Sequence, residues 1–159
     1  MFIVFFLLIL LIIFNKEGFR NNEDIEICST DPMTGYTRNG KCNLIEEDQG
    51  THTVCAELTN EFLEFSRNKG NDLITPNPQY NFLGLNDGDN WCLCALRWKQ
   101  AYDCAEDPEC SDISSENVPK IIVDSTHIKT LDFVEDLSDQ NIRERYIKDI
   151  NLVCNISDV

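Results

Sequence analysis

Hydrophobic residues form one unbroken block at the start of the chain, from Met1 to Phe14. As a helix this block would span about 21 Å, which is shorter than the ~30 Å hydrocarbon core of a bilayer and fits a signal-peptide core or a short anchor. The polar linker that follows, residues 15–24, offers only Gly18 as a small residue for a cleavage site. The pattern therefore favours an uncleaved single-pass anchor, with the membrane as a partner through residues 1–14.

The first half of the remaining chain predicts a turn, a strand and a helix. Asn39 and Gly40 both tolerate positive φ and predict a tight hairpin turn. Residues 51–58 alternate between two faces, as a strand does. Thr59 has the chemistry of a helix N-cap, and Gly70 ends the helix that we expect to follow it.

The middle of the chain predicts a long loop and then a second helix. Residues 70–90 are interrupted by glycine and proline, so they form either a packed loop or the wall of a site. Residues 91–103 contain no helix breaker and carry Trp91, Cys94 and Trp98 at helical spacing. We therefore expect one helix over 91–103, with Cys94 packing as a small hydrophobic residue on its aromatic stripe.

The last part of the chain adds a strand and a third helix. An acidic insertion over 103–116 contains Cys104 and Cys110, and a buried type of strand over 120–124 follows Pro119. Ser138 is a cap signal for a final helix. These elements predict a single compact α+β domain over residues 25–159, with short strands, about three helices and long irregular loops.

Composition and charge exclude two classes of protein. The chain has 159 residues, of which 42% are hydrophobic, as in globular proteins and unlike disordered ones. It carries 13 basic and 28 acidic residues, a formal net charge of -15. Such a surface repels a phosphate backbone, so we expect no nucleic-acid partner.

Eight cysteines make the redox compartment important. An even number suits a disulfide framework, although about 105 pairings exist and the connectivity cannot be deduced from the sequence. Cys104 and Cys110 close a short loop, which makes them candidates for a local disulfide. Together with a glycosylation sequon at Asn155, the cysteines favour a lumenal or extracellular domain over a cytoplasmic one.

Four strings of the chain resemble a known family. They are CSTDPMTGYTRNGKC, DQGTHTVCAELTNEFLEFS, GNDLITPNPQYNFLGLNDGDNWCLCALRW and DSTH. In order and spacing they are similar to the domain of unknown function 2237 family, which is small and mostly bacterial, over about residues 25–137. The family's motif positions fall on Cys28, Pro32, Thr34, Gly35, Arg38, Gly40, Cys42, His52, Cys55, Gly70, Asn71, Asp72, Thr75, Pro76, Gly84, Gly88, Asp89, Trp91, Cys92, Cys94, Arg97, Trp98 and His127.

The resemblance implies no activity, because none is established for the family. Its typical member is a compact protein that looks cytosolic, which implies that the five shared cysteines need not be oxidised. The three other cysteines lie in parts that depart from the family pattern, as does the apolar leader. That combination fits a move into an oxidising compartment.

A metal site is one candidate for the shared cysteines. The chain has no Cys-x-x-Cys motif of the kind that structural zinc sites use. Zinc ligands could still converge from separate segments, and no other cofactor is predicted. The candidate ligands are Cys28, Cys42, Cys55, Cys92 and His52.

A thiol site is the other candidate. Cys92, near the expected helix start, is the sulfur that we would test first for a bond, a metal or a reaction. Hydrolysis would need a histidine beside a cysteine, and a loop aspartate or arginine could bind a ligand. The catalytic candidates are Cys92, Cys55, His52, His127, Asp72 and Arg97.

The sequence is compatible with two functions of different classes. The first is a membrane-anchored, cysteine-rich structural or ligand-binding module. The second is a thiol-redox or metal-thiolate enzyme that uses Cys55, Cys92 and Cys94 with His52 and His127. The sequence leaves undecided whether the protein is an enzyme.

Overall fold

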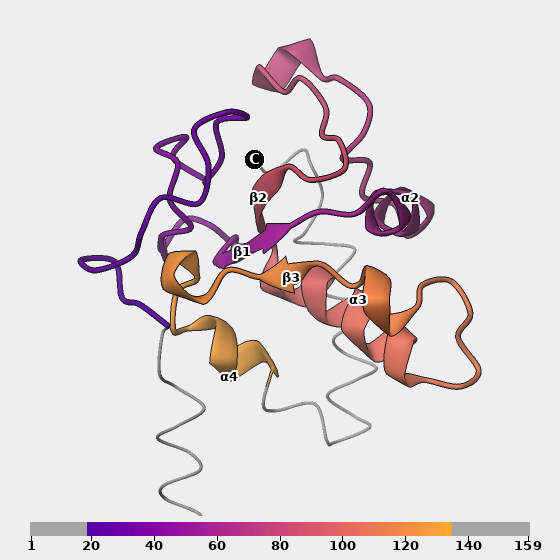
Figure 1. The fold of residues 1–159 in the computed structure, drawn as a ribbon. Helices are drawn as coiled ribbons and strands as arrows, with labels where there is room; N and C mark the ends of the chain where they lie inside the picture. Colours follow the sequence, from indigo (N-terminus) through magenta and orange to yellow (C-terminus); the bar gives the residue numbers. More distant parts are fainter. Residues whose placement is uncertain (1–18, 135–159) are drawn as a thin grey trace, which may run out of the picture.

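A computed structural model describes residues 19–134. Three short strands, β1 (Val54–Glu57), β2 (Asn90–Leu93) and β3 (Lys120–Ile121), form an antiparallel sheet in the order β2-β1-β3. Three helices accompany the sheet: α2 (Asn60–Asn68), α3 (Ala95–Glu106) and α4 (Thr130–Val134). Single 3-10 turns lie at Pro78–Tyr80, Ser115–Asn117 and Val123–Ser125. The predicted α+β class, with short strands and long loops, is confirmed (Figure 1).

The two faces of the sheet build two different cores. In the β1–β2 register Val54 lies opposite Leu93, and Cys55 lies opposite Cys92. Because strand side chains alternate, the cysteines point away from the apolar face. The apolar face contributes to the large core. The other face contributes to a small cluster, called the sulfur cluster below, which consists of Ile25, Cys28, Cys42, Cys55 and Cys92. The N-terminal loops lie on one side of the strands and α2 on the other, while α3 runs beneath (Figure 1).

Helix α2 follows its sequence signals closely. The Thr59 hydroxyl accepts a hydrogen bond from the Phe62 backbone N–H at 3.1 Å, as expected of an N-cap. Phe62, Leu63 and Phe65 are buried against the sheet. Gly70, at φ 90°, leaves the helical conformation just after α2 ends.

The prediction of one helix over 91–103 is wrong for its first residues. Residues 90–93 are β2, and α3 starts only at Ala95, with Cys94 as its N-cap. Trp91, Cys92 and Leu93 are all buried, because β2 packs the large core on one face and the sulfur cluster on the other. The sequence of a strand buried on both faces does not alternate between apolar and polar residues. The apolar residues of β2 therefore looked like the start of the apolar face of α3.

Two smaller expectations are also corrected. The chain around Asn39 and Gly40 forms turns and bends rather than a strand hairpin, and positive φ occurs at Arg38 and Gly40. The strand expected over 120–124 is only β3, because the chain coils into the Val123–Ser125 turn. In that turn Thr126 donates its hydroxyl hydrogen to the Ile122 carbonyl at 2.9 Å.

The long loop over 71–89 is tied to the core. Leu73, Phe82 and Leu85 are buried, and the Leu85 N–H donates to the Leu73 carbonyl at 2.9 Å. Gly84 has φ 81°, and an added Cβ would meet the Ile74 carbonyl oxygen at 2.2 Å, so only glycine fits there. The loop is therefore a packed wall rather than a loose connection.

Several expectations fall outside the described residues. They are the apolar block 1–14, the first part of the linker over 15–18, the final helix after Ser138, and positions Cys154 and Asn155. Within residues 19–134 no helix is long and apolar enough to span a bilayer.

Disulfides join Cys42 to Cys92 and Cys104 to Cys110. Removing the Cys42–Cys92 bond should destabilise the domain more than removing the Cys104–Cys110 bond. The first bond joins residues 50 positions apart and the second residues 6 apart, so the first restricts the unfolded chain far more. Chain-entropy estimates are about 4 and about 2 kcal/mol respectively. Urea unfolding of Cys42→Ala/Cys92→Ala and Cys104→Ala/Cys110→Ala tests this order. Equal losses would contradict it.

Candidate functional site

The described cysteines are all oxidised. Disulfides join Cys28 to Cys55 and Cys42 to Cys92 in the small core, and Cys104 to Cys110 after α3. The local pair proposed from the sequence is thus bonded. Cys94 also forms a disulfide, so it is more than a packing residue, and no cysteine in the described part of the chain is free.

This bonding changes the interpretation of the thiol candidates. Cys55 and Cys92 have exposed fractions of 0% and 2%, and both sulfurs are in disulfides. A nucleophilic or redox cysteine needs an accessible thiolate. Neither residue meets that condition in this oxidised form of the domain.

His52 is held by an acidic residue that sequence reasoning missed. Its Nδ1 lies 2.7 Å from Asp48 Oδ1, and its backbone N–H donates to Asp48 Oδ2 at 2.7 Å. Both side chains are almost completely buried. The pair closes the turn that leads into β1, where Thr51 has φ 50°. His52 therefore has a structural role, and its Nδ1 is not available as a metal ligand.

His127 joins the chain after β3 to β1. Its backbone N–H donates to the Thr53 carbonyl at 3.0 Å, and its ring Nδ1 accepts the Lys129 N–H at 3.1 Å. An accepting Nδ1 requires the neutral ring or the loss of that bond. Burial, and then the nearby charge of Lys129, lower the pKa of His127 below its usual value.

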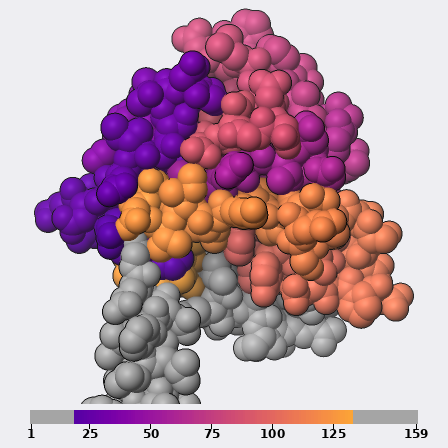
Figure 2. Space-filling model, viewed as in Figure 1, coloured from indigo at the N-terminus to yellow at the C-terminus, as the bar shows by residue number. Residues whose placement is uncertain are grey.

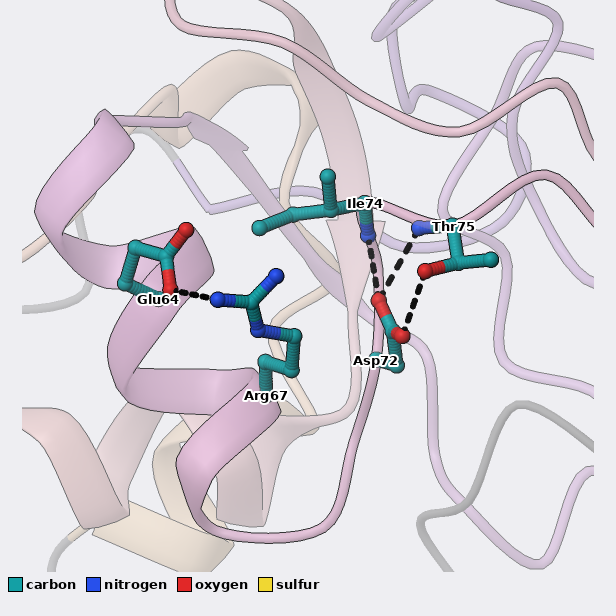
Figure 3. Close-up of polar contacts among 5 residues, drawn as sticks. All are labelled: Glu64, Arg67, Asp72, Ile74 and Thr75. Atoms are coloured by element: carbon teal, nitrogen blue, oxygen red, sulfur yellow. Dashed lines mark hydrogen bonds and ion pairs between the residues drawn. The ribbon is translucent and has the colours of Figure 1, made fainter.

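Asp72 organises its own loop, as Figure 3 shows. Its Oδ1 accepts the backbone N–H groups of Ile74 and Thr75 at 2.9 Å each, and its Oδ2 accepts the Thr75 hydroxyl at 2.7 Å. Burial raises the pKa of Asp72, but these hydrogen bonds and the charge of Arg67 outweigh it and lower the pKa. Arg67 itself pairs with Glu64 (Figure 3). These contacts of the carboxylate hold its own loop in shape, which is a structural role.

Arg97 links α3 to the end of α2. The side chain is 2% exposed, and its Nη1 donates to the Lys69 carbonyl at 3.0 Å and to Gln100 Oε1 at 3.1 Å. A buried guanidinium bonded to a helix C-terminus is a common structural device. Of the six catalytic candidates, Cys55 and Cys92 thus lie opposite each other in the β1–β2 register, whereas Arg97 binds the end of α2.

A pocket at the β2 edge is the candidate binding site of the described residues. It has a volume of about 250 Å³ and lies between the 30–38 loop and the 81–85 segment. Figure 2 shows these N-terminal and middle segments lying against each other on the surface. The lining residues are Thr30, Asp31, Pro32, Met33, Arg38, Asn81, Phe82, Leu83, Gly84, Leu85 and Trp91.

Arg38 is the distinctive group of this pocket. Its guanidinium carbon lies 5.1 Å from the Trp91 ring centroid, and its Nη1 donates to the Met33 carbonyl at 3.2 Å. No acidic side chain of residues 19–134 forms an ion pair with it. Burial lowers the pKa of Arg38, yet a guanidinium stays charged at neutral pH.

The pocket walls combine apolar and acidic surface. Phe82 meets Trp91 edge to face, with ring centroids 5.6 Å apart. Leu83, at 82% exposed, adds a large apolar side chain to the lining. Asp31 also lines the pocket and is exposed. One pocket thus offers a cation, an anion and an aromatic wall.

Most of the chain matches the model of one protein family. The model described as "uncharacterized protein conserved in bacteria (DUF2237)" matches residues 21–141. The chain belongs to this family. No curated protein matches the chain. Four of the DUF2237 motif positions noted in the sequence line the pocket, namely Pro32, Arg38, Gly84 and Trp91.

Removing the His127 side chain should reduce the acid sensitivity of the domain. Because the folded-state pKa is lowered, the unfolded chain binds more protons as the pH falls, and stability is lost below the unfolded value of about 6.5. We expect His127→Gln to lose less stability than the parent between about pH 7.5 and about pH 5.

Urea unfolding at the two pH values measures the difference between the proteins. The substitution leaves every other residue unchanged, so the difference between the two proteins reports His127. Identical losses in parent and variant would show that His127 does not contribute.

Proposed function

We propose that this chain is a disulfide-stabilised binding domain of an oxidising compartment, held at a membrane by residues 1–14. Three disulfides within the described residues support the compartment, because such bonds persist mainly outside the cytosol. The apolar composition of residues 1–14 supports the anchor.

The Arg38 pocket is the binding site in this proposal. The observation that carries it is the half-buried guanidinium stacked on Trp91 without an acidic partner among the described residues. Partial burial of a charge is unfavourable unless a partner compensates it. Within residues 19–134 this five-donor group donates one hydrogen bond, to the Met33 carbonyl, so a ligand carboxylate can bind to the remaining donors.

Two further features define the ligand. The edge of Phe82 and the face of Trp91 suit a flat apolar group. Asp31 lines the same pocket, so a ligand with a carboxylate and an ammonium group matches both charges better than a simple anion does. We therefore propose an aromatic or apolar amino acid, or a peptide end, as the ligand class. The volume of about 250 Å³ suits a small molecule of this kind.

The thiol-enzyme alternative is less well supported. Cys55 and Cys92 are buried in disulfides, while His52 and His127 are engaged by Asp48 and by the Lys129 backbone. The binding interpretation needs no rearrangement of these groups.

A fluorine NMR titration of the full chain with labelled tryptophans tests the proposal. Trp91 lines the Arg38 pocket, and Trp98 lines a separate hollow of about 320 Å³ beside Tyr102 and Val118. Phenylalanine, phenylacetate and phenethylamine share a ring and differ in charge. We expect the Trp91 resonance to shift most strongly with phenylalanine, less with phenylacetate and least with phenethylamine.

Arg38→Gln should weaken the binding of phenylalanine and of phenylacetate at least tenfold, about 1.4 kcal/mol, because the substitution removes a charge-assisted hydrogen bond to the ligand carboxylate. Arg67→Gln is the matched control, because it removes an equal charge at an exposed ion pair on α2. Asp31→Asn should abolish the preference for phenylalanine over phenylacetate. Shifts at Trp98 alone, or equal effects of Arg38→Gln and Arg67→Gln, would contradict the proposal.

A further inference from the structure

Four cysteines from three separate parts of the chain converge under the sheet. The Sγ atoms of Cys28, Cys42 and Cys55 lie within 4.8 Å of one another, and Cys92 Sγ is bonded to Cys42 Sγ. In a tetrahedral zinc site with Zn–S bonds of about 2.3 Å, the sulfurs are about 3.8 Å apart. We infer that, when its thiols are reduced, this cluster is a four-cysteine site for zinc or a similar thiophilic cation.

Backbone hydrogen bonds, and not the sulfur–sulfur bonds alone, place the strand cysteines. The Cys55 N–H donates to the Thr126 hydroxyl at 3.0 Å, and the Cys55 carbonyl accepts the Ile122 N–H at 2.8 Å. The backbone of Cys55 thus faces β3, which makes Cys55 and Cys92 a pair without mutual hydrogen bonds. In such pairs the two Cα atoms are only about 4.5 Å apart, and the side chains share one face.

Backbone contacts place the loop cysteines as well. The Cys28 N–H donates to the Gly40 carbonyl at 2.7 Å, and the Gly40 N–H donates to the Thr34 carbonyl at 2.9 Å. The Thr34 hydroxyl in turn accepts the Cys92 N–H at 2.9 Å. These bonds hold the 28–42 loop against β1 and β2, as its position in Figure 1 shows, so the framework of the site does not rest on the disulfides alone.

The chemistry of the cluster selects the cation. All four cysteines are at most 6% exposed, and their apolar neighbours are Ile25 and Ile122. Four sulfur ligands without a carboxylate suit zinc and exclude magnesium and calcium, which prefer oxygen. His52, a candidate ligand from the sequence, is engaged by Asp48 and is not required.

The two forms of the site interconvert by a balanced reaction. Each disulfide takes two electrons and two protons from a dithiol reductant, which becomes a disulfide, so both together yield four thiols. Binding of one divalent cation then releases the four thiol protons to solvent. In the reverse direction, two disulfide oxidant molecules each accept two electrons from a pair of the four thiolates and become two thiolates each, the two protein disulfides form again, and the metal ion is released. This site is separate from the Arg38 pocket and does not rest on it.

Cobalt titration tests the inference on the full chain, purified in mild detergent, reduced and freed of metal and reductant without air. We expect one cobalt ion per chain, with the d–d and charge-transfer absorption of a tetrahedral thiolate site, and displacement by one equivalent of zinc. The oxidised chain should not bind. Cys42→Ser should weaken cobalt binding at least tenfold, whereas Cys104→Ser/Cys110→Ser should bind as the parent does.

Alkylation of the zinc-loaded chain identifies the ligands even if a variant fails to fold. Cys28, Cys42, Cys55 and Cys92 should be protected, while Cys104 and Cys110, which form a partly exposed group with Asp112, should react. No saturable binding by the reduced parent, protection of a different set of cysteines, or unaltered binding by a folded Cys42→Ser variant would overturn the inference.

Discussion

The pairing of Cys55 with Cys92 across β1 and β2 is the constraint on which the rest of the structure depends. Because these residues lie opposite each other without mutual backbone hydrogen bonds, their side chains emerge close together on one face of a very small sheet. The same register directs Val54 and Leu93 to the other face, where α2 and α3 cover them. A slip of one residue would exchange the two faces. The register therefore decides which side of the sheet contains sulfur and which contains the apolar core.

The short strands of this sheet are supplemented by hydrogen bonds from the chain around them. β3 contributes only two residues, and the chain that follows it returns to β1 through the Thr126 hydroxyl and the His127 backbone. On the other side, the Leu58 N–H donates to the Asp89 carbonyl and the Gly88 N–H to the Leu58 carbonyl, which fixes the entry to β2. Side-chain and loop hydrogen bonds thus replace part of the ladder that longer strands would provide.

The sequence predicted those parts of the fold whose signals are local. Thr59 and Gly70 mark the two ends of α2, and the short loop between Cys104 and Cys110 suggested their bond. β2 was missed because Trp91, Cys92 and Leu93 are buried on both faces and continue into the stripe of α3. The site was missed for a related reason. Arg38 and Trp91 are far apart in sequence, and no local pattern indicates that a loop arginine stacks on a strand tryptophan.

The disulfides and the pocket are parts of one mechanical arrangement. The segment that supplies Thr30, Asp31 and Arg38 to the pocket lies between Cys28 and Cys42, which are bonded to β1 and β2 respectively. Cys92 is the immediate neighbour of Trp91. The Cys42–Cys92 disulfide therefore fixes the Cys42 end of the loop beside the aromatic wall of the pocket. Such preorganisation lowers the entropy cost of ligand binding. A metal bound by the same four sulfurs would fix both ends of the loop in the same place. The oxidised and metal-bound forms would therefore present the same pocket, whereas a reduced, metal-free chain would lose the covalent fixation of Arg38 over Trp91.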